Sequence, residues 1–308
     1  MTIYIKPKVS LVVIHWNQER LTTETIHSLK QIRYPAYEIL LVDNGSDDGS
    51  GNVIGQRFPD IRMVRSDVNL GYTGGANLGM VDALSHGADY VFVLNNDIEV
   101  EPDILNELIA AMASSSFPRA GMAAPTIYFH DTSHVIWYGG GECDPATGIA
   151  RHTDFGKTDN LSAKSPTPCT FINGCAMFIP REVIDTVGLL DTSYFHTGED
   201  VDYSIRVKRA GYTLLMVPNA RLWHKVRSSM GGNVPSNPRY NYYEFRNRLL
   251  IYKKYFFKER VGVKPVFRLV DFYLRHIYYQ LRQGSLRDAV AIVHGACHGI
   301  MGRRGKVL

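Results

Sequence analysis

Cysteine is scarce in this 308-residue sequence, and its spacing carries no metal or redox motif. The four cysteines, Cys143, Cys169, Cys175 and Cys297, form no CxxC pair. A reduced, cytosolic chain is therefore the simpler interpretation. The opening MTIYIKPKVSLVV lacks the basic region, the long apolar run and the cleavage site of a secretion signal. No stretch approaches the roughly 20 apolar residues that cross a bilayer, so we expect a cytoplasmic location.

Two nucleotide-binding motifs are also missing. The turn after the first predicted strand reads HWNQER instead of GxGxxG, and GxxxxGK[ST] occurs nowhere. Both absences argue against NAD-dependent enzymes and P-loop NTPases. The glycine-rich run from Asn69 to Gly79 does not replace these motifs, because its glycines fall at the wrong spacing.

Acidic residues are depleted at the C-terminal end. From Arg239 onward there are 15 Lys and Arg against 4 Asp and Glu, a net charge of +11, whereas the preceding part has 19 against 26, a net charge of −7. Such a basic segment favours an anionic partner. We therefore divide the chain into a body, residues 1–236, and a basic, aromatic-rich helical extension, residues 237–308, with helices near 239–258, 264–282 and 286–299.

Apolar runs and amphipathic segments alternate over the first 115 residues or so. The predicted strands are 8–14, 38–42, 61–64 and 90–94. A helix with Leu21, Ile26 and Leu29 at near-helical spacing is predicted after the first strand, and further helices at about 73–86 and 101–113. This alternation predicts an α/β fold with a mostly parallel central sheet and helices on both faces. Residues 120–168 are irregular and are expected to form strands and loops. A strand over 170–179, a helix over 181–187 and a strand over 213–217 follow.

Polar clusters stand at three predicted strand ends. They are His15-Trp16-Asn17, Asp43-Asn44-Gly45-Ser46 and Asn95-Asn96-Asp97. In open α/β sheets ligands bind beyond the carboxyl ends of the strands, so the three clusters together predict a pocket.

Two residues are candidates for binding Mn²⁺ or Mg²⁺. Asp97 follows a buried strand beside two amides, and its carboxylate suits a hard cation that also holds a diphosphate. His224 follows another strand and is the second candidate ligand. The alternatives are an Asx turn at Asp97 and a hydrogen-bonded structural role for His224. Gly74 and Gly75 permit close approach to a sugar or phosphate, or else pack a helix onto the sheet.

The segment FHTGEDVDYSIRVKRAGY, residues 195–212, predicts a short helix with acids in its first turn and bases in its last. Glu199, Asp200 and Asp202 fall within four positions. Alone, such acids simply complement the helix dipole.

The segment RYNYYEFRNRLLIYKKYFF, residues 239–257, mixes basic residues with tyrosines. This composition suits an anionic membrane surface. The alternative is a helical cap on the body with a solvated basic face. We expect no nucleic-acid partner, because no DNA- or RNA-binding motif is present.

The motifs, taken in order, resemble glycosyltransferase family 2, and within it the bacterial rhamnosyltransferase-like branch. The matching pieces, over roughly residues 8–250, are VSLVVIHWNQ, LLVDNGSDDGS, NLGYTGGANLG, VFVLNNDIEVEPDIL, INGCAMFIPREVIDTVGLLD, FHTGEDVDYSIRVKRAGY, Trp223-His224 and YYEFRNRLL. The resemblance implies a GT-A fold, a nucleotide-diphosphate sugar donor, a divalent metal and inversion at the anomeric carbon.

The resemblance also implies roles for single residues. Those near the donor are His15, Asn17, Asp43, Asn69, Gly74, Gly75, Asn95 and Asn96, with Asp43 reading the nucleobase. Asp97 matches the metal-binding end of the DxD motif, whose first acidic position is Asn95 here, so the metal relies more on His224. Asp200 matches the catalytic base, Glu199 is its acidic neighbour, and Asp202 remains a structural acid. The loop 225–238 would be a lid over the donor.

The function expected from this resemblance is inverting sugar transfer in bacterial surface-polysaccharide synthesis at the inner face of the membrane. The expected donor is dTDP-rhamnose, and the alternatives are UDP-hexoses and UDP-N-acetylhexosamines. The expected acceptor is a saccharide or a lipid-linked saccharide. Two other functions rank lower: a nucleotidyltransferase, which needs a glycine-rich loop after the first strand, and a non-catalytic sugar-nucleotide-binding protein, which Asn95 would suit.

Overall fold

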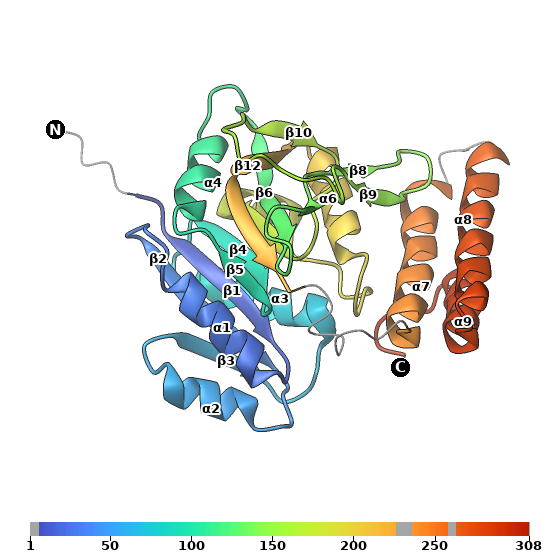
Figure 1. Ribbon diagram of the computed structural model, residues 1–308, viewed down its shortest axis with the longest axis horizontal. Helices are drawn as coiled ribbons and strands as arrows, with labels where there is room; N and C mark the ends of the chain where they lie inside the picture. Colours follow the sequence, from blue (N-terminus) through green and yellow to red (C-terminus); the bar gives the residue numbers. More distant parts are fainter. Residues whose placement is uncertain (1–5, 226–235, 258–262, 308) are drawn as a thin grey trace.

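The computed structural model describes residues 6–225, 236–257 and 263–307. In these ranges the central sheet has ten strands, with the order β10-β12-β6-β11-β4-β1-β2-β3, while β5 pairs with β12 and β7 with β6 (Figure 1). The strands of the N-terminal half are β1 (Val9–His15), β2 (Tyr37–Asn44), β3 (Arg62–Ser66), β4 (Tyr90–Asn95) and β5 (Ile98–Val100). The later strands of this sheet are β6 (Ala120–Phe129), β7 (Ile136–Tyr138), β10 (Thr167–Cys169), β11 (Ala176–Pro180) and β12 (Thr213–His224).

Strands β1 to β4 form the parallel part of the sheet, whereas β5 pairs antiparallel with β12. β1 pairs in parallel with both β2 and β4, and β2 pairs in parallel with β3. β1, β2 and β4 are mostly apolar on both faces because helices cover them, and Val12, Leu41 and Val93 have no exposed surface. β3, at the edge of the sheet, is only partly buried. The helices here are α1 (Glu19–Leu29), α2 (Ser50–Arg57), α3 (Gly71–Ser85) and α4 (Ile104–Met112). The predicted α/β fold is confirmed, and α2 is an addition that the turn-rich sequence around it concealed.

The second half of the sheet is mixed. β11 pairs antiparallel with β4 and with β6, whereas β12 runs parallel to β6. The strand predicted at 170–179 begins only at Ala176, and the strand predicted at 213–217 continues past an irregularity to His224. The helices of this half are α5 (Arg181–Val187) and α6 (Glu199–Arg209), and a separate two-stranded sheet contains β8 (Gly141–Cys143) and β9 (Ala150–His152).

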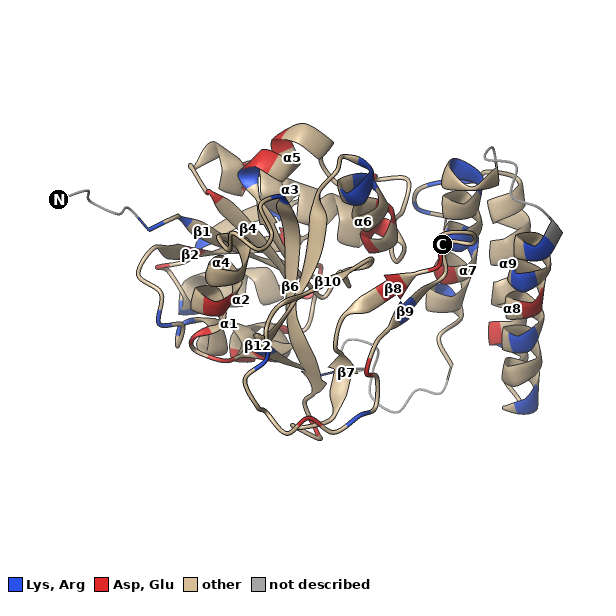
Figure 2. Ribbon diagram, turned by 90° about the horizontal axis from the view of Figure 1, so that it is seen from above, with Lys and Arg blue, Asp and Glu red and all other residues tan. Residues whose placement is uncertain are grey.

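Three helices form the C-terminal extension: α7 (Pro238–Tyr255), α8 (Val263–Arg282) and α9 (Leu286–Ile300). In Figures 1 and 2, α7 lies between the body and the pair α8–α9. The α9 helix approaches α7 closely at Gly295 and Gly299, where an added Cβ would lie 2.4 and 2.7 Å from backbone oxygens of α7. None of the described helices combines the length and apolar character needed to span a bilayer.

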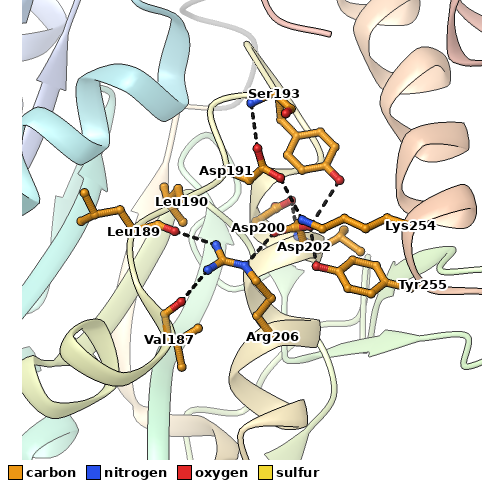
Figure 3. A network of polar contacts seen from close by, with 12 residues as sticks. Val187, Leu189, Leu190, Asp191, Ser193, Asp200, Asp202, Arg206, Lys254 and Tyr255 are labelled. Carbon is orange, nitrogen blue, oxygen red and sulfur yellow. Dashed lines mark hydrogen bonds and ion pairs between the residues drawn. The ribbon is translucent and has the colours of Figure 1, made fainter. Parts of the chain in front are cut away.

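A buried carboxylate joins α6 to α7. Asp202 has no exposed surface and lies 2.9 Å from Arg206 Nε, and it accepts hydrogen bonds from Lys254 (2.7 Å) and the Tyr255 hydroxyl (2.6 Å) (Figure 3). Lys254 also contacts Asp191. The expectation that Asp202 is structural is confirmed, and its partners show that α7 is docked on the body by buried charge.

Candidate active site

A cavity of about 720 Å³ lies beyond the carboxyl ends of the parallel strands. Trp16 follows β1, Asn44 ends β2 and Asp97 follows β4, and all three line this cavity. The other walls come from the segment before β11, from the start of α6 and from α7. The volume falls within the range of about 300–1,000 Å³ that is typical of small-molecule sites.

A strained turn presents two carboxylates to the cavity. Thr197 and Gly198 have left-handed backbones, with φ of 62° and 85°, and Glu199 and Asp200 follow at the start of α6. Asn247 of α7 holds this turn, because its Nδ2 donates to the Thr197 carbonyl oxygen at 2.7 Å. A left-handed threonine costs about 1–3 kcal/mol, so the turn depends on such support.

Burial sets the protonation of the two acids. It raises the pKa of Asp200 to about 6, even though the backbone N–H groups of Gly174 (3.0 Å) and Val201 (2.8 Å) donate to this carboxylate. Burial and the charge of Asp200 raise the pKa of Glu199 well above its usual range. At neutral pH, Asp200 is therefore ionised, and its charge together with burial favours the protonated form of Glu199. Glu199 Oε2 has no hydrogen-bond partner among the described residues.

The two predicted metal ligands meet in the same cavity. Asp97 Oδ1 lies 3.0 Å from His224 Nε2, and Asp97 is 1% exposed. Asp97 Oδ2 finds no donor in the part of the chain that the structure describes, and His224 Nδ1 finds no partner there. Burial lowers the pKa of His224, but Cys175 and Asp97 outweigh it and raise the pKa to about 10.

These residues fit a divalent cation that shares its ligands with a substrate. The buried Asp97 carboxylate supplies an oxygen donor, and the His224 ring would supply a nitrogen donor on giving up the proton that Asp97 and Cys175 favour. Within residues 6–225, 236–257 and 263–307, no three His, Cys, Asp or Glu side chains gather as a complete metal site. The remaining ligands would have to come from a bound diphosphate or from water.

Three predicted donor residues line the cavity near Asp97 or at the start of α3. Asn95 and Asn96 precede Asp97, and Asn96 Nδ2 donates to Thr22 Oγ1 at 2.9 Å. Asn69 Oδ1 accepts the Gly71 N–H at 2.8 Å and so fixes the turn that enters α3. All three residues that line the cavity here are amides rather than acids.

The other predicted donor residues do not line the cavity. The ring of His15 is buried, with its nitrogens 2.7 Å from Thr22 Oγ1 and 2.8 Å from Ser50 Oγ. Asn17 Nδ2 donates to Asp47 at 3.1 Å. These contacts join the loops after β1 and β2.

The expected nucleobase acid and the glycine pair are also not among the residues that line the cavity. Asp43 is fully buried and accepts hydrogen bonds from Arg65 Nε (2.7 Å) and the Ser46 N–H (3.0 Å). A Cβ on Gly75 would lie 3.1 Å from the Asn44 side chain, and one on Gly74 would lie 2.5 Å from Leu70 Cβ. The contacts of Gly75 match the packing alternative, in which the helix sits closely on the sheet.

The sequence interpretation missed a wall formed by α7. Tyr240, Glu244 and Arg248 line the cavity at four-residue spacing, and Glu244 forms an ion pair with Arg248. Arg248 also lies over the Phe272 ring of α8, 4.6 Å from its centroid. The regular spacing in YYEFRNRLL was a usable signal, because residues four apart share one helix face.

A second missed wall comes from the irregular region. His152 Nδ1 lies 2.9 Å from the Trp137 carbonyl oxygen, and Asn173 Nδ2 lies 3.2 Å from His152 Nε2. Burial lowers the pKa of His152, so the ring is neutral and accepts from Asn173. No local pattern marked these residues. The predicted lid over 225–238 lies mostly outside the described residues; Lys225, its first residue, bonds Glu24 at 2.7 Å.

The fold is that of solved nucleotide-sugar enzymes. The chain is similar to a structure of GalNAc-T7 with UDP, GalNAc and Mn²⁺, with a TM-score of 0.62, 19% identity and coverage of 80% of this chain and 48% of that one. It is also similar to the mannosyltransferase PcManGT from Pyrobaculum calidifontis, in complex with GDP-Man and Mn²⁺, with a TM-score of 0.56, 17% identity and coverage of 99% and 77%. These likenesses define the fold as GT-A.

The sequence comparison places the chain more closely. Residues 7–242 match the family described as "Glycosyltransferase like family 2", and the chain belongs to this family. One relative is the N-acetylglucosaminyl-diphospho-decaprenol L-rhamnosyltransferase of Mycobacterium tuberculosis, 28% identical over 65% of this chain and 70% of that protein. The protein is thus a nucleotide-sugar glycosyltransferase, and the expected family and fold are confirmed.

Proposed function

We propose that this glycosyltransferase inverts the sugar it transfers, with Asp200 as its single base. The observation that carries the proposal is the position of Asp200 at the start of α6, where its carboxylate lines the cavity and two backbone N–H groups hold it. Burial raises its pKa to about 6, so the carboxylate is ionised at neutral pH. A base whose pKa lies near the working pH accepts a proton well without being protonated before the reaction.

The geometry at Asp200 suits proton removal from an acceptor hydroxyl. Each carboxylate oxygen accepts one backbone N–H, from Gly174 or from Val201, so the carboxylate is held in one orientation. The remaining lone pairs are available to a hydroxyl in the cavity. General-base catalysis of this kind contributes about 10²- to 10⁴-fold. One base and one displacement give inversion.

The proposed metal site is Asp97 with His224. A bound Mn²⁺ or Mg²⁺ supplies Lewis-acid stabilisation of the charge that develops on the departing diphosphate. Asp97 Oδ2, unpaired among the described residues, and the adjacent imidazole of His224 are the groups that would hold it. The Mn²⁺ in the two similar structures supports this assignment for the fold.

The proposed donor is dTDP-rhamnose and the proposed acceptor is a saccharide, most simply a lipid-linked one, in polysaccharide synthesis at the inner face of the membrane. The name of the mycobacterial relative supports both choices, because that protein is a rhamnosyltransferase whose name includes a lipid diphosphate. We assign the acceptor saccharide to the α7 wall. There Arg239 and Arg248 supply positive charge, and the Glu244 carboxylate can accept hydrogen bonds from sugar hydroxyls. UDP-hexoses and UDP-N-acetylhexosamines are the alternative donors.

A panel of nucleotide sugars with Mn²⁺ tests the donor. A ligand that binds only the native state adds about 2.7 kcal/mol of stability at 100 times its dissociation constant, so the right donor should raise the melting temperature clearly. Product from the best donor and a lipid-linked acceptor should then be checked for inverted anomeric configuration. A retained configuration would contradict the single-base mechanism.

The rival function is sugar-nucleotide binding without catalysis, which the amide of Asn95 favours because it removes one acid from the metal site. The same panel separates the two functions. A catalytic protein consumes the donor in the presence of metal and acceptor, and Asp200→Asn stops consumption while donor-induced stabilisation remains. Stabilisation by a donor that neither form consumes would support the rival.

A further inference from the structure

Exposed apolar side chains are concentrated on α8 and α9. The described residues include 20 large hydrophobic side chains that are exposed, and 12 of them lie between Val266 and Met301. Scattered exposed apolar residues are ordinary on soluble proteins, but a contiguous patch marks an interaction site. The two helices therefore carry a surface that the rest of the described chain does not cover.

On α8, five of the seven exposed large apolar side chains among the described residues form one stripe. Phe267, Val270, Leu274, Tyr278 and Leu281 are exposed and follow each other at intervals of three or four. This spacing puts them on one helix face. The opposite face, which includes Leu269 and Tyr273, is buried against α7.

A matching stripe runs along α9. Leu286, Val290, Val293 and Ile300 are exposed and share one face by the same spacing, and Cys297, also exposed, completes it. Ala289, Ala291 and Ile292 are buried on its other side. Each helix therefore has two apolar sides, one that packs inside the protein and one that is exposed. We call the two exposed stripes the α8–α9 face.

Cations border this face. Residues 263–307 contain 8 Lys and Arg against 2 Asp and Glu, and one of the acids, Asp288, is fully buried. Lys264, Arg268, Arg275 and Arg282 are exposed on one side of the α8 stripe, and Figure 2 shows basic residues along this helix. Only two of these cations have carboxylate partners among the described residues: Arg275 with Asp271 and Arg268 with Asp144.

We propose that the α8–α9 face lies in the plane of an anionic lipid surface. Apolar stripes with basic borders bind at the boundary between lipid headgroups and acyl chains, where the cations meet anionic lipids. A second copy of the chain fits less well, because pairing two such faces would bring like charges together. The proposal does not depend on the identity of the donor or acceptor.

The structure also corrects which helix faces the membrane. The tyrosines that drew attention in the sequence, Tyr242, Tyr243, Tyr252 and Tyr255, are buried on α7. Helix α7 is therefore the cap of the alternative interpretation. It lies between the lipid-facing helices and the cavity, and the stacking of Arg248 on Phe272 joins the α7 wall to α8.

Co-sedimentation of the full chain with vesicles tests the proposal. Vesicles of phosphatidylcholine with phosphatidylglycerol should bind at least about tenfold more tightly than pure phosphatidylcholine, and high salt should weaken the binding. Phe267→Ser combined with Leu274→Ser should weaken binding at least about tenfold. Phe155→Ser is the matched control, because Phe155 is 58% exposed on the body and Phe267 68% exposed on α8. Circular dichroism checks that each variant is folded.

Each outcome decides the proposal. Equal binding of the wild type and the double variant, or no binding to anionic vesicles, overturns it. A dimer in analytical ultracentrifugation that the double variant abolishes, without vesicle binding, would assign the face to a second copy instead. Transfer to a soluble acceptor should be unchanged in the double variant, so a failure of this proposal is distinguishable from a failure of the proposed reaction.

Discussion

Replacing Asp200 by Asn should abolish transfer and at the same time stabilise the protein at neutral pH. The folded-state pKa of Asp200 is about 6, against 3.8 for an ordinary aspartate. Keeping this carboxylate ionised in its buried position therefore costs about 3 kcal/mol above pH 7, at about 1.36 kcal/mol per pKa unit. An amide has no charge to bury.

The gain is smaller than this full amount. The carboxylate accepts two backbone N–H bonds, from Gly174 and Val201, and the Asn amide can accept only one of them. Leaving one donor unpaired costs about 1–2 kcal/mol. The net stabilisation expected for Asp200→Asn is therefore about 1–2 kcal/mol at pH 8. Removing the charge also relieves Glu199, whose pKa Asp200 raises.

The difference in stability between the wild type and Asp200→Asn should change with pH. A raised folded-state pKa means that the stability is fully present below pH 3.8 and is lost as pH rises through about 6. The wild type loses this stability between those values, whereas Asp200→Asn does not. The variant should thus be no more stable than the wild type at pH 4 and more stable at pH 8.

Asp202→Asn is the matched control on the same helix. Asp202 is fully buried and accepts hydrogen bonds from the partly exposed cations Arg206 and Lys254, so its replacement by a neutral amide weakens these charge-assisted bonds and should cost about 1.5–3 kcal/mol. Urea denaturation at pH 4 and pH 8, with a transfer assay beside it, measures both variants. If Asp200→Asn is less stable than the wild type at pH 8, or transfers sugar within tenfold of the wild-type rate, the reasoning is refuted.

The remaining predictions concern the rate, the metal, the turn and the acceptor. The wild-type kcat should rise about tenfold per pH unit below pH 6 and level off above it, as Asp200 loses its proton; a flat profile between pH 5 and 7 would exclude it as base. His224→Ala should raise the Mn²⁺ concentration for half-maximal activity about tenfold or more, and an unchanged metal titration would show that the ring is no ligand. Asn247→Ala should lower kcat while leaving the KM for the donor unchanged, because it removes the hydrogen bond to the Thr197 turn. A normal kcat would show that the turn keeps its conformation without this bond. Arg248→Met should raise the KM for the acceptor and not for the donor, and the opposite pattern would move the acceptor away from α7.

The sequence predicted the parallel half of the sheet well because its strands are buried on both faces. Val91, Phe92, Val93 and Leu94 have no exposed surface, so nothing polar interrupts the run. The helix 181–187 was predicted with its observed ends. Such elements can be predicted from a short window of sequence, because the hydrophobic pattern along one element matches its pattern of burial.

The rest of the site depends on contacts between distant positions. Gly174 donates to Asp200 across 26 residues, and Arg246 and Asn247 reach the loop before α6 from the far side of the chain. Asp43, the expected nucleobase acid, also has partners inside the fold, Arg65 and Ser46, which its place at a strand end did not predict. The sequence pattern identifies the type of residue at a strand end, but not the distant residue with which it forms hydrogen bonds.

The bond from Asn247 to the Thr197 turn changes how variants of the extension should be judged. The two residues lie 50 positions apart. Asn247 belongs to the basic segment that, judged by charge alone, would be taken for a membrane anchor. A genetic screen that scores activity would class a lesion at Asn247 with lesions of the base, while one at Phe267 would behave as a targeting defect. Chimeras that exchange tails between family members should therefore join after Tyr255, where α7 ends, so that each base keeps the helix that positions it.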